Sequence, residues 1–147
     1  MKFFHSAAAL ICSLAFVSAA QAEAVFSCTI AKNQKVLQLA DTAGQVVYVY
    51  GKKGATPELE IAVARGDAEL YAWEGFGRYH THSVALSRGE YRYTVYTSLD
   101  SLTGETMAGV TVEKSDKLLA DLACTMATVK GDLEGYVLGL KEALALP

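Results

Sequence analysis

Residues 79–97 read YHTHSVALSRGEYRYTVYT, and this stretch decides the fold. Two runs rich in β-branched and aromatic residues, 79–86 and 91–97, stand on either side of a short turn that contains Gly89. Strongly β-forming runs joined by a short glycine-bearing turn are typical of a β-hairpin. We therefore expect residues 79–97 to form two antiparallel strands.

The same alternating pattern continues on both sides of this hairpin, with turn residues about every eight to twelve positions. The other expected strands are residues 25–30, 36–40, 46–50, 59–63, 70–74 and 107–112. The spacing leaves no room for the helical crossovers that parallel strands need. The pattern predicts an all-β fold, an antiparallel β-sandwich or flattened barrel of about eight strands with a short C-terminal helix.

Residues 118–124 fit either a helix or a further strand. We favour the strand, because it would pair with residues 107–112 and bring Cys124 within reach of Cys28. The last part of the chain changes period: Leu133, Val137, Leu140 and Leu144 recur at helical spacing. Residues 129–147 are therefore expected to form an amphipathic helix, capped by Asp132 and docked on the domain or on a partner.

The first 22 residues have the pattern of a secretory signal peptide. Lys2 gives a positive start, residues 7–20 are apolar or small, and an Ala-x-Ala end is reached at Ala22. The apolar part is shorter than the roughly 20 residues of a spanning helix, so no membrane span is expected. We predict a signal peptide over 1–22, a β-domain over 23–128 and the helix over 129–147. The mature protein is expected to be soluble and periplasmic or secreted.

The charge of the chain narrows the class of possible partner, and its cysteines predict a disulfide. The whole chain carries 13 Lys and Arg against 16 Asp and Glu, and without Lys2 the balance is 12 − 16 = −4. The charges are scattered, which argues against a nucleic-acid partner and permits a basic protein partner. Cleavage removes Cys12 and leaves Cys28 and Cys124, which we expect to form a disulfide in an exported protein.

His80 and His82 alternate in an expected strand, so both imidazoles lie on one face, about 6–7 Å apart. Such a pair is a common beginning of a zinc site, but zinc takes three or four ligands. Of the remaining side chains, only carboxylates such as Glu74 or Glu90 could complete the set. The alternative is that both histidines lie on the solvent face of the strand. We predict no metal and no other cofactor, and keep a metal site at His80 and His82 as a second hypothesis.

The turn at residues 87–91 places Ser87, Arg88 and Tyr91 at a loop tip, where binding residues concentrate. These three residues, with His80 and His82, are the tentative binding residues, although the pattern favours an ordinary glycine-containing hairpin turn at residues 87–91. We identify no catalytic constellation, so the chain is predicted not to be an enzyme.

The stretch 71–83 is dense in aromatic residues and glycines. Trp73 and Phe76 are expected to pack in the core or on the sheet. Gly75 and Gly77 are expected to be bend positions with positive φ.

Several short motifs carry a resemblance to known proteins. They are Cys28-Thr29, Asn33-x-Lys35, Tyr48-x-Tyr50-Gly51, Pro57-Glu58-Leu59, Trp73-x-Gly75-x-Gly77, Tyr93-Thr94-Val95-Tyr96, Ala108-Gly109-Val110 and Cys124. Together they resemble a family of small exported bacterial β-proteins without assigned function. The match covers most of the mature chain and implies no site residues.

A looser similarity, in size, export, β architecture and disulfide, is to the periplasmic lysozyme inhibitors. Those proteins insert a Ser-Gly-x-Tyr loop into the lysozyme cleft, and here Arg88 stands between Ser87 and Gly89. The similarity implies a lysozyme as the partner, with Ser87 and Tyr91 in contact with it. Three functions follow as hypotheses: a non-enzymatic binding domain, a metal-binding protein or enzyme at His80 and His82, and a structural module of a cell-envelope assembly.

Overall fold

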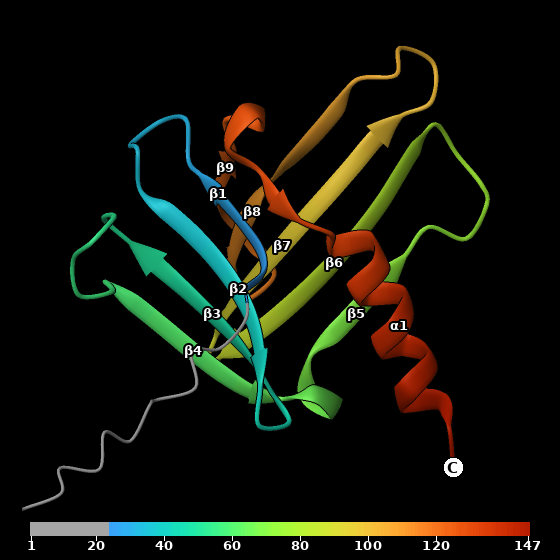
Figure 1. Cartoon of the computed structure of the whole chain (residues 1–147), viewed down its shortest axis with the longest axis horizontal. Helices are drawn as coiled ribbons and strands as arrows, with labels where there is room; N and C mark the ends of the chain where they lie inside the picture. The colour runs from blue at the N-terminus through green and yellow to red at the C-terminus, as the bar shows by residue number, and fades with distance from the viewer. Residues whose placement is uncertain (1–23) are drawn as a thin grey trace, which may run out of the picture.

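The structure is a computed structural model that describes residues 24–147, so the signal peptide predicted for residues 1–22 lies outside the described residues. The described residues form two five-stranded antiparallel sheets and one C-terminal helix (Figure 1). No helix in this part of the chain is long and apolar enough to cross a membrane.

The first sheet has the strand order β10-β1-β2-β3-β4. Its strands are β1 (Ala24–Thr29), β2 (Val36–Thr42), β3 (Gln45–Gly51), β4 (Leu59–Ala64) and β10 (Lys130–Gly131). The second sheet has the order β5-β6-β7-β8-β9. Its strands are β5 (Glu69–Ala72), β6 (Tyr79–Arg88), β7 (Tyr91–Asp100), β8 (Thr106–Lys114) and β9 (Lys117–Ala123). Short 3₁₀ turns, η1 (Arg65–Asp67) and η2 (Met126–Thr128), lie in two of the connections.

These sheets confirm the predicted antiparallel sandwich, whereas the flattened barrel is not formed because the two sheets stay separate. Residues 24–147 form ten strands rather than about eight. The ambiguous segment 118–124 is a strand, as favoured, and β9 pairs with β8. The hairpin predicted for residues 79–97 is β6–β7, paired without interruption from Tyr79 and Asp100 to Arg88 and Tyr91.

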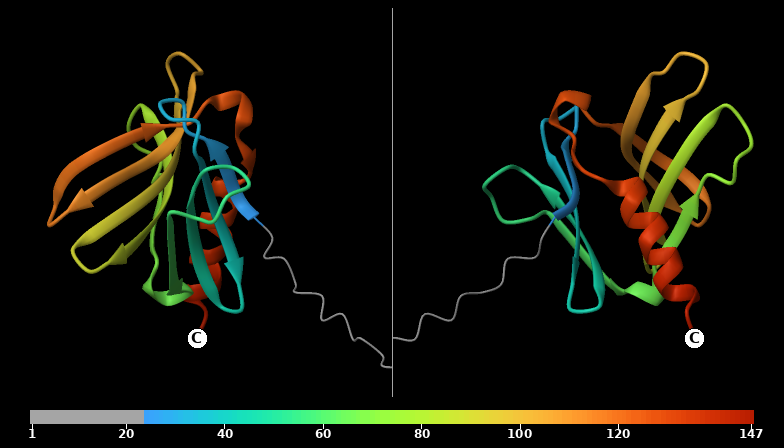
Figure 2. Two further views of the ribbon diagram at one scale, coloured as in Figure 1. Left: turned by 90° about the vertical axis from the view of Figure 1, so that its left-hand side faces the viewer. Right: turned by 45° about the vertical axis from the view of Figure 1, so that its right-hand side comes forward.

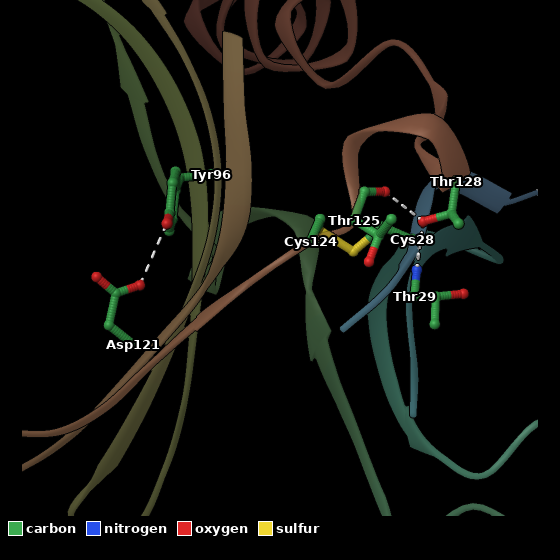
Figure 3. The surroundings of a disulfide bond; sticks show 7 residues. All are labelled: Cys28, Thr29, Tyr96, Asp121, Cys124, Thr125 and Thr128. Atoms are coloured by element: carbon green, nitrogen blue, oxygen red, sulfur yellow. Dashed lines mark hydrogen bonds between the residues drawn. A yellow bond between two sulfur atoms is a disulfide. The ribbon is translucent and has the colours of Figure 1, made fainter. Parts of the chain in front are cut away.

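The two sheets are joined at one corner, where the end of β1 meets the end of β9. Cys28 and Cys124 form the predicted disulfide there (Figure 3). Backbone hydrogen bonds run beside it: Thr125 N donates to Thr29 O at 2.8 Å, and Ala31 N donates to Ala123 O at 2.9 Å. This corner, residues 28–31 and 123–125, is hereafter the β1–β9 seam.

The core lies between the sheets and beneath the helix. Alternate side chains of the strands point into it, as the period of two requires. Its buried members include Phe26, Ile30, Leu37, Leu39, Val46, Tyr48, Ile61, Val84, Leu86, Val95, Val110, Leu133 and Val137. Tyr48 and Tyr93 meet across the two sheets with ring centroids 5.4 Å apart.

The helix α1 (Leu133–Ala145) begins four residues later than the predicted segment 129–147. Lys130 and Gly131 pair with β1 instead, and Asp132 then caps the helix by accepting a hydrogen bond from Gly135 N at 2.9 Å. The helix contacts β6 and β5, as Figure 2 shows in its right-hand view.

The apolar stripe of α1 is used within the domain. Leu133, Val137 and Leu140 are buried in the core, whereas Leu144 is 47 % exposed. The docking surface on which the envelope-module hypothesis depends is therefore largely occupied by the protein's own sheet. Tyr136 adds a polar anchor on the same helix, because its hydroxyl donates to Asp41 Oδ2 at 2.7 Å.

The disulfide closes a loop with a sequence separation of 96 residues. We expect the double substitution Cys28→Ala, Cys124→Ala to lower the free energy of unfolding by about 4 kcal/mol, because the unfolded chain regains the entropy of that long loop. Urea unfolding of native and substituted protein at equal concentration measures the change. Equal unfolding midpoints for the two proteins would contradict this expectation.

Candidate functional site

The predicted binding residues fall into two groups at opposite ends of β6. His80 and His82 lie near its start, while Ser87 and Arg88 end it and Tyr91 opens β7. Ser87 is five positions beyond His82, which is about 16 Å along a strand at about 3.3 Å per residue. The structure therefore places the tentative binding residues in two separate groups.

His82 does not lie on the solvent face of the sheet, and that alternative is wrong for this residue. It is only 5 % exposed, because it shares a face with Val84 and Leu86, which belong to the core, and α1 packs over β6. Its Nδ1 lies 3.9 Å from Oε2 of Glu134, in the first turn of α1, which is beyond hydrogen-bond distance.

His80 lies nearer to the surface and is held by Trp73. The two rings are stacked, with centroids 3.6 Å apart and planes inclined by 22°. Trp73 is fixed in turn because its Nε1 donates to Phe76 O at 2.6 Å.

The predicted burial of Phe76 is wrong: its side chain is 85 % exposed, since residues 73–78 form a loop outside the sheet. Gly75 and Gly77 have φ of +91° and +89°, which confirms the predicted bends.

A cavity of about 320 Å³ opens beside His80, between the end of the second sheet and the start of α1. Residues that line it include His80, Thr97, Leu99, Met107, Met126 and Glu134. This cavity is hereafter the histidine cleft. Sequence reasoning missed Met107, Met126 and Glu134, which come from β8, η2 and α1. The sequence does contain one signal for the two methionines, which is their scarcity: Met107 and Met126 are the only methionines after Met1.

The histidine cleft does not provide the ligand set expected for zinc. Within residues 24–147, no three His, Cys, Asp or Glu side chains converge as a metal site would require. Glu90, one of the two carboxylates considered from the sequence, lies in the turn at the opposite end of β6. Cys28 and Cys124 are bonded to each other.

The second group forms the tip of the β6–β7 hairpin, residues 87–91, hereafter the β6–β7 tip. Its turn consists of Gly89 and Glu90 alone, and Gly89 has a φ of +60°, a left-handed conformation that favours glycine. Ser87 and Arg88 are exposed, and Tyr91 is 38 % exposed. The tip therefore presents its side chains outward from the end of two ten-residue strands.

Neighbouring groups hold the β6–β7 tip in place. Ser115 N, in the adjacent β8–β9 turn, donates to Glu90 O at 3.0 Å. The ring of Tyr91 stacks on that of Tyr93 with centroids 6.5 Å apart, and Lys114 Nζ lies 5.4 Å from the centre of the Tyr91 ring. Arg88 extends toward β4, with Nη1 3.5 Å from Glu60 O. Tyr91 and Arg88 are thus partly pre-organised for contact with another molecule.

An ion pair fixes the other end of the hairpin, next to the histidine cleft. Arg78 donates two hydrogen bonds to the carboxylate of Asp100, at 2.7 and 2.6 Å. Leu102 N donates a third at 3.0 Å. The bonds from Arg78, with that from Leu102, hold the pKa of the Asp100 carboxyl well below its usual range. This clamp fixes the strand ends that carry His80 and Leu99.

Because the pKa of Asp100 is lowered on folding, its ionised form stabilises the protein above the unfolded-state pKa of about 4. That stabilisation is lost as the pH falls toward the lower folded-state pKa. We expect Asp100→Asn to melt at a lower temperature than the native protein at pH 7, with a gap that narrows as the pH falls below about 4.

Thermal unfolding followed by circular dichroism between pH 2 and pH 7 measures this gap. Asp116→Asn, at an exposed position in the β8–β9 turn, is the matched control and should follow the native protein. A gap for Asp100→Asn that stays constant with pH would contradict the role given to the Arg78 pair.

Comparison of the chain with protein-family models, with curated proteins and with solved structures finds no match. The structure itself shows two separate surfaces at the two ends of the β6–β7 hairpin. One is the rigid exposed tip, and the other is the cleft of about 320 Å³ whose lining includes His80, Met107 and Met126.

Proposed function

We propose that this chain is an exported, non-enzymatic protein-binding domain that inserts its β6–β7 tip into a concave site of a partner. The observation that carries the proposal is the exposure of Ser87, Arg88 and Tyr91 at the end of two long paired strands. A rigid scaffold that presents a few exposed side chains is the usual arrangement of a binding loop. Ordering such a tip on binding costs little, because its neighbours already hold it.

The concrete form of the proposal is inhibition of a lysozyme in the periplasm or outside the cell. Glycoside hydrolases of this kind cut sugar chains between two carboxyl groups in a cleft. Arg88 brings a guanidinium to the tip, and guanidinium groups pair strongly with carboxylates. The disulfide is compatible with an exported protein. The looser similarity to periplasmic lysozyme inhibitors supports the same partner.

The test mixes the mature protein with c-, g- and i-type lysozymes and measures the lysis of cell-wall suspensions. We expect one class to be inhibited, and expect Arg88→Ala and Tyr91→Ala each to weaken inhibition about tenfold or more, since Arg and Tyr are frequent anchors of interfaces. Lys52→Ala, at an exposed position in the β3–β4 loop, is the matched control and should inhibit like the native protein.

Two outcomes separate the general proposal from the concrete one. Failure to inhibit any lysozyme at micromolar excess removes lysozyme as the partner. A partner captured from envelope extracts equally well by native protein and by the double variant Arg88→Ala, Tyr91→Ala would remove the tip as the binding surface.

A further inference from the structure

The two most exposed large apolar side chains of residues 24–147 lie on neighbouring loops. The β5–β6 loop, residues 73–78, carries Phe76, which is 85 % exposed, and the β7–β8 loop, residues 101–105, carries Leu102, which is 75 % exposed. Both loops stand side by side at the same end of the second sheet (Figure 1, Figure 2). They are hereafter the apolar loop pair. Large exposed apolar side chains that gather in one place mark an interaction site.

The outer face of the second sheet continues this apolar end behind the loops. Tyr79 and Met107 alternate with the core positions of β6 and β8, so both lie on the face that points away from the core. Tyr79 pairs with Asp100 at the very end of the hairpin, and Met107 pairs with Ser98 two positions further in. Tyr79 is 49 % exposed and Met107 is 38 % exposed. Apolar surface thus extends from the loops onto the sheet.

Hydrogen bonds fix the two loops to each other and to the hairpin. Ser101 N donates to Arg78 O at 3.0 Å, which joins one loop to the other. The carboxylate of Asp100 accepts two bonds from the Arg78 guanidinium and one from Leu102 N. Contact with another surface therefore costs little ordering of these loops.

The size of the apolar loop pair favours a lipid bilayer over a protein partner. A buried aromatic side chain contributes about 150–250 Å². Phe76 and Leu102 together therefore supply no more than about half of the roughly 800 Å² that each partner brings to a stable protein interface. A second copy of the chain would be held weakly by so small an area, whereas a bilayer accepts single apolar side chains.

The order of residues in the β5–β6 loop also suits a bilayer. Phe76 is in the middle of the loop, and its carbonyl accepts a bond from the indole of Trp73, directly after β5. Tyr79 opens β6 on the other side. Trp and Tyr are enriched at the headgroup level of membranes, where one end of the side chain is apolar and the other is hydrated. An apolar side chain between them is then placed to reach the acyl chains.

The charges of the two loops select the kind of lipid. Arg78 is paired with Asp100, so its charge is compensated. The other charged residues of the loops are Glu74 and Glu105, which are both exposed. Anionic headgroups attract basic segments and repel carboxylates. The apolar loop pair is therefore suited to zwitterionic headgroups.

We infer that the apolar loop pair inserts into the headgroup region of a zwitterionic bilayer, with Phe76 and Leu102 as the penetrating side chains. Two side chains bury less apolar surface than one acyl chain, and even a single acyl chain binds reversibly, so the attachment is reversible. The inference does not rest on the proposed function, because the β6–β7 tip lies at the other end of β6.

The experiment mixes the mature protein with vesicles of phosphatidylcholine, or of phosphatidylcholine and phosphatidylglycerol, and separates bound from free protein by flotation. We expect the protein to float with the phosphatidylcholine vesicles and to float less with the mixed ones. Trp73 is the only tryptophan of the chain and is bonded to Phe76, so its fluorescence reports on insertion. Its emission should shift to shorter wavelengths and be quenched by lipids brominated near the headgroup.

Two variants and a control test the penetrating side chains. Phe76→Ala and Leu102→Ala are each expected to weaken binding to phosphatidylcholine vesicles about tenfold, because each removes most of one buried apolar side chain. Leu146→Ala is the matched control and should bind like the native protein. Leu146 is 71 % exposed and lies at the C-terminal end of α1, away from the two loops (Figure 1). All three variants should melt like the native protein, because each changes an exposed side chain.

Four outcomes would overturn the inference. Native protein that floats with neither kind of vesicle has no such membrane contact. Unchanged flotation of the double variant Phe76→Ala, Leu102→Ala places the contact elsewhere on the protein. Stronger binding to the phosphatidylglycerol vesicles that added salt removes indicates adsorption by charge instead. Native protein that sediments as a dimer without lipid, while the double variant sediments as a monomer, makes a second copy of the chain the occupant.

Discussion

The β1–β9 seam is the constraint on which the rest of the structure depends. Without it, the two sheets would be linked by the β4–β5 and β9–β10 connections, by the packing of α1 and by the packing of their faces. The disulfide and its flanking backbone hydrogen bonds fix the end of β9 on the end of β1. The chain then returns through η2 to β10, which pairs with β1 and delivers α1 onto the second sheet. The position of the helix, and of the cleft beneath its start, follows from this corner.

Alternation along β6 is the second determinant, because it assigns each side chain to a face. His82, Val84 and Leu86 point to the side that α1 and the first sheet cover, so a histidine enters the core. At the two ends of β6, α1 and the first sheet no longer cover the strand. His80 at one end is then available to a cavity, and Arg88 at the other end is available to a partner. One strand, β6, thereby carries an exposed surface at each end, because the elements packed on it are shorter than the strand.

The strands, the disulfide and the cap at Asp132 could be predicted because each depends on local patterns or on the pairing of the only two candidate cysteines. The burial of His82 could not, since a period of two separates the faces of a strand without saying which face is covered. The prediction that Phe76 is buried was wrong for a related reason: this aromatic residue stands between two glycines and belongs to the loop rather than to the sheet. The histidine cleft combines residues of β6, β7, β8, η2 and α1, and periodicity does not encode such long-range packing.

The β6–β7 tip and the histidine cleft occupy regions that the fold holds separately. Met126 follows Cys124 by two residues, and the short connection is fixed because Thr128 Oγ1 accepts a hydrogen bond from Thr29 N at 2.9 Å (Figure 3). The wall of the cleft is therefore tied to the β1–β9 seam. The β6–β7 tip is tied instead to the β8–β9 turn through Glu90 and Ser115. Coupling between two sites needs an element with two arrangements that both sites bias. The β6–β7 ladder is uninterrupted and is clamped at its cleft end by Arg78 and Asp100. It is therefore a rigid spacer, and a partner bound at the tip should leave the geometry of the cleft unchanged.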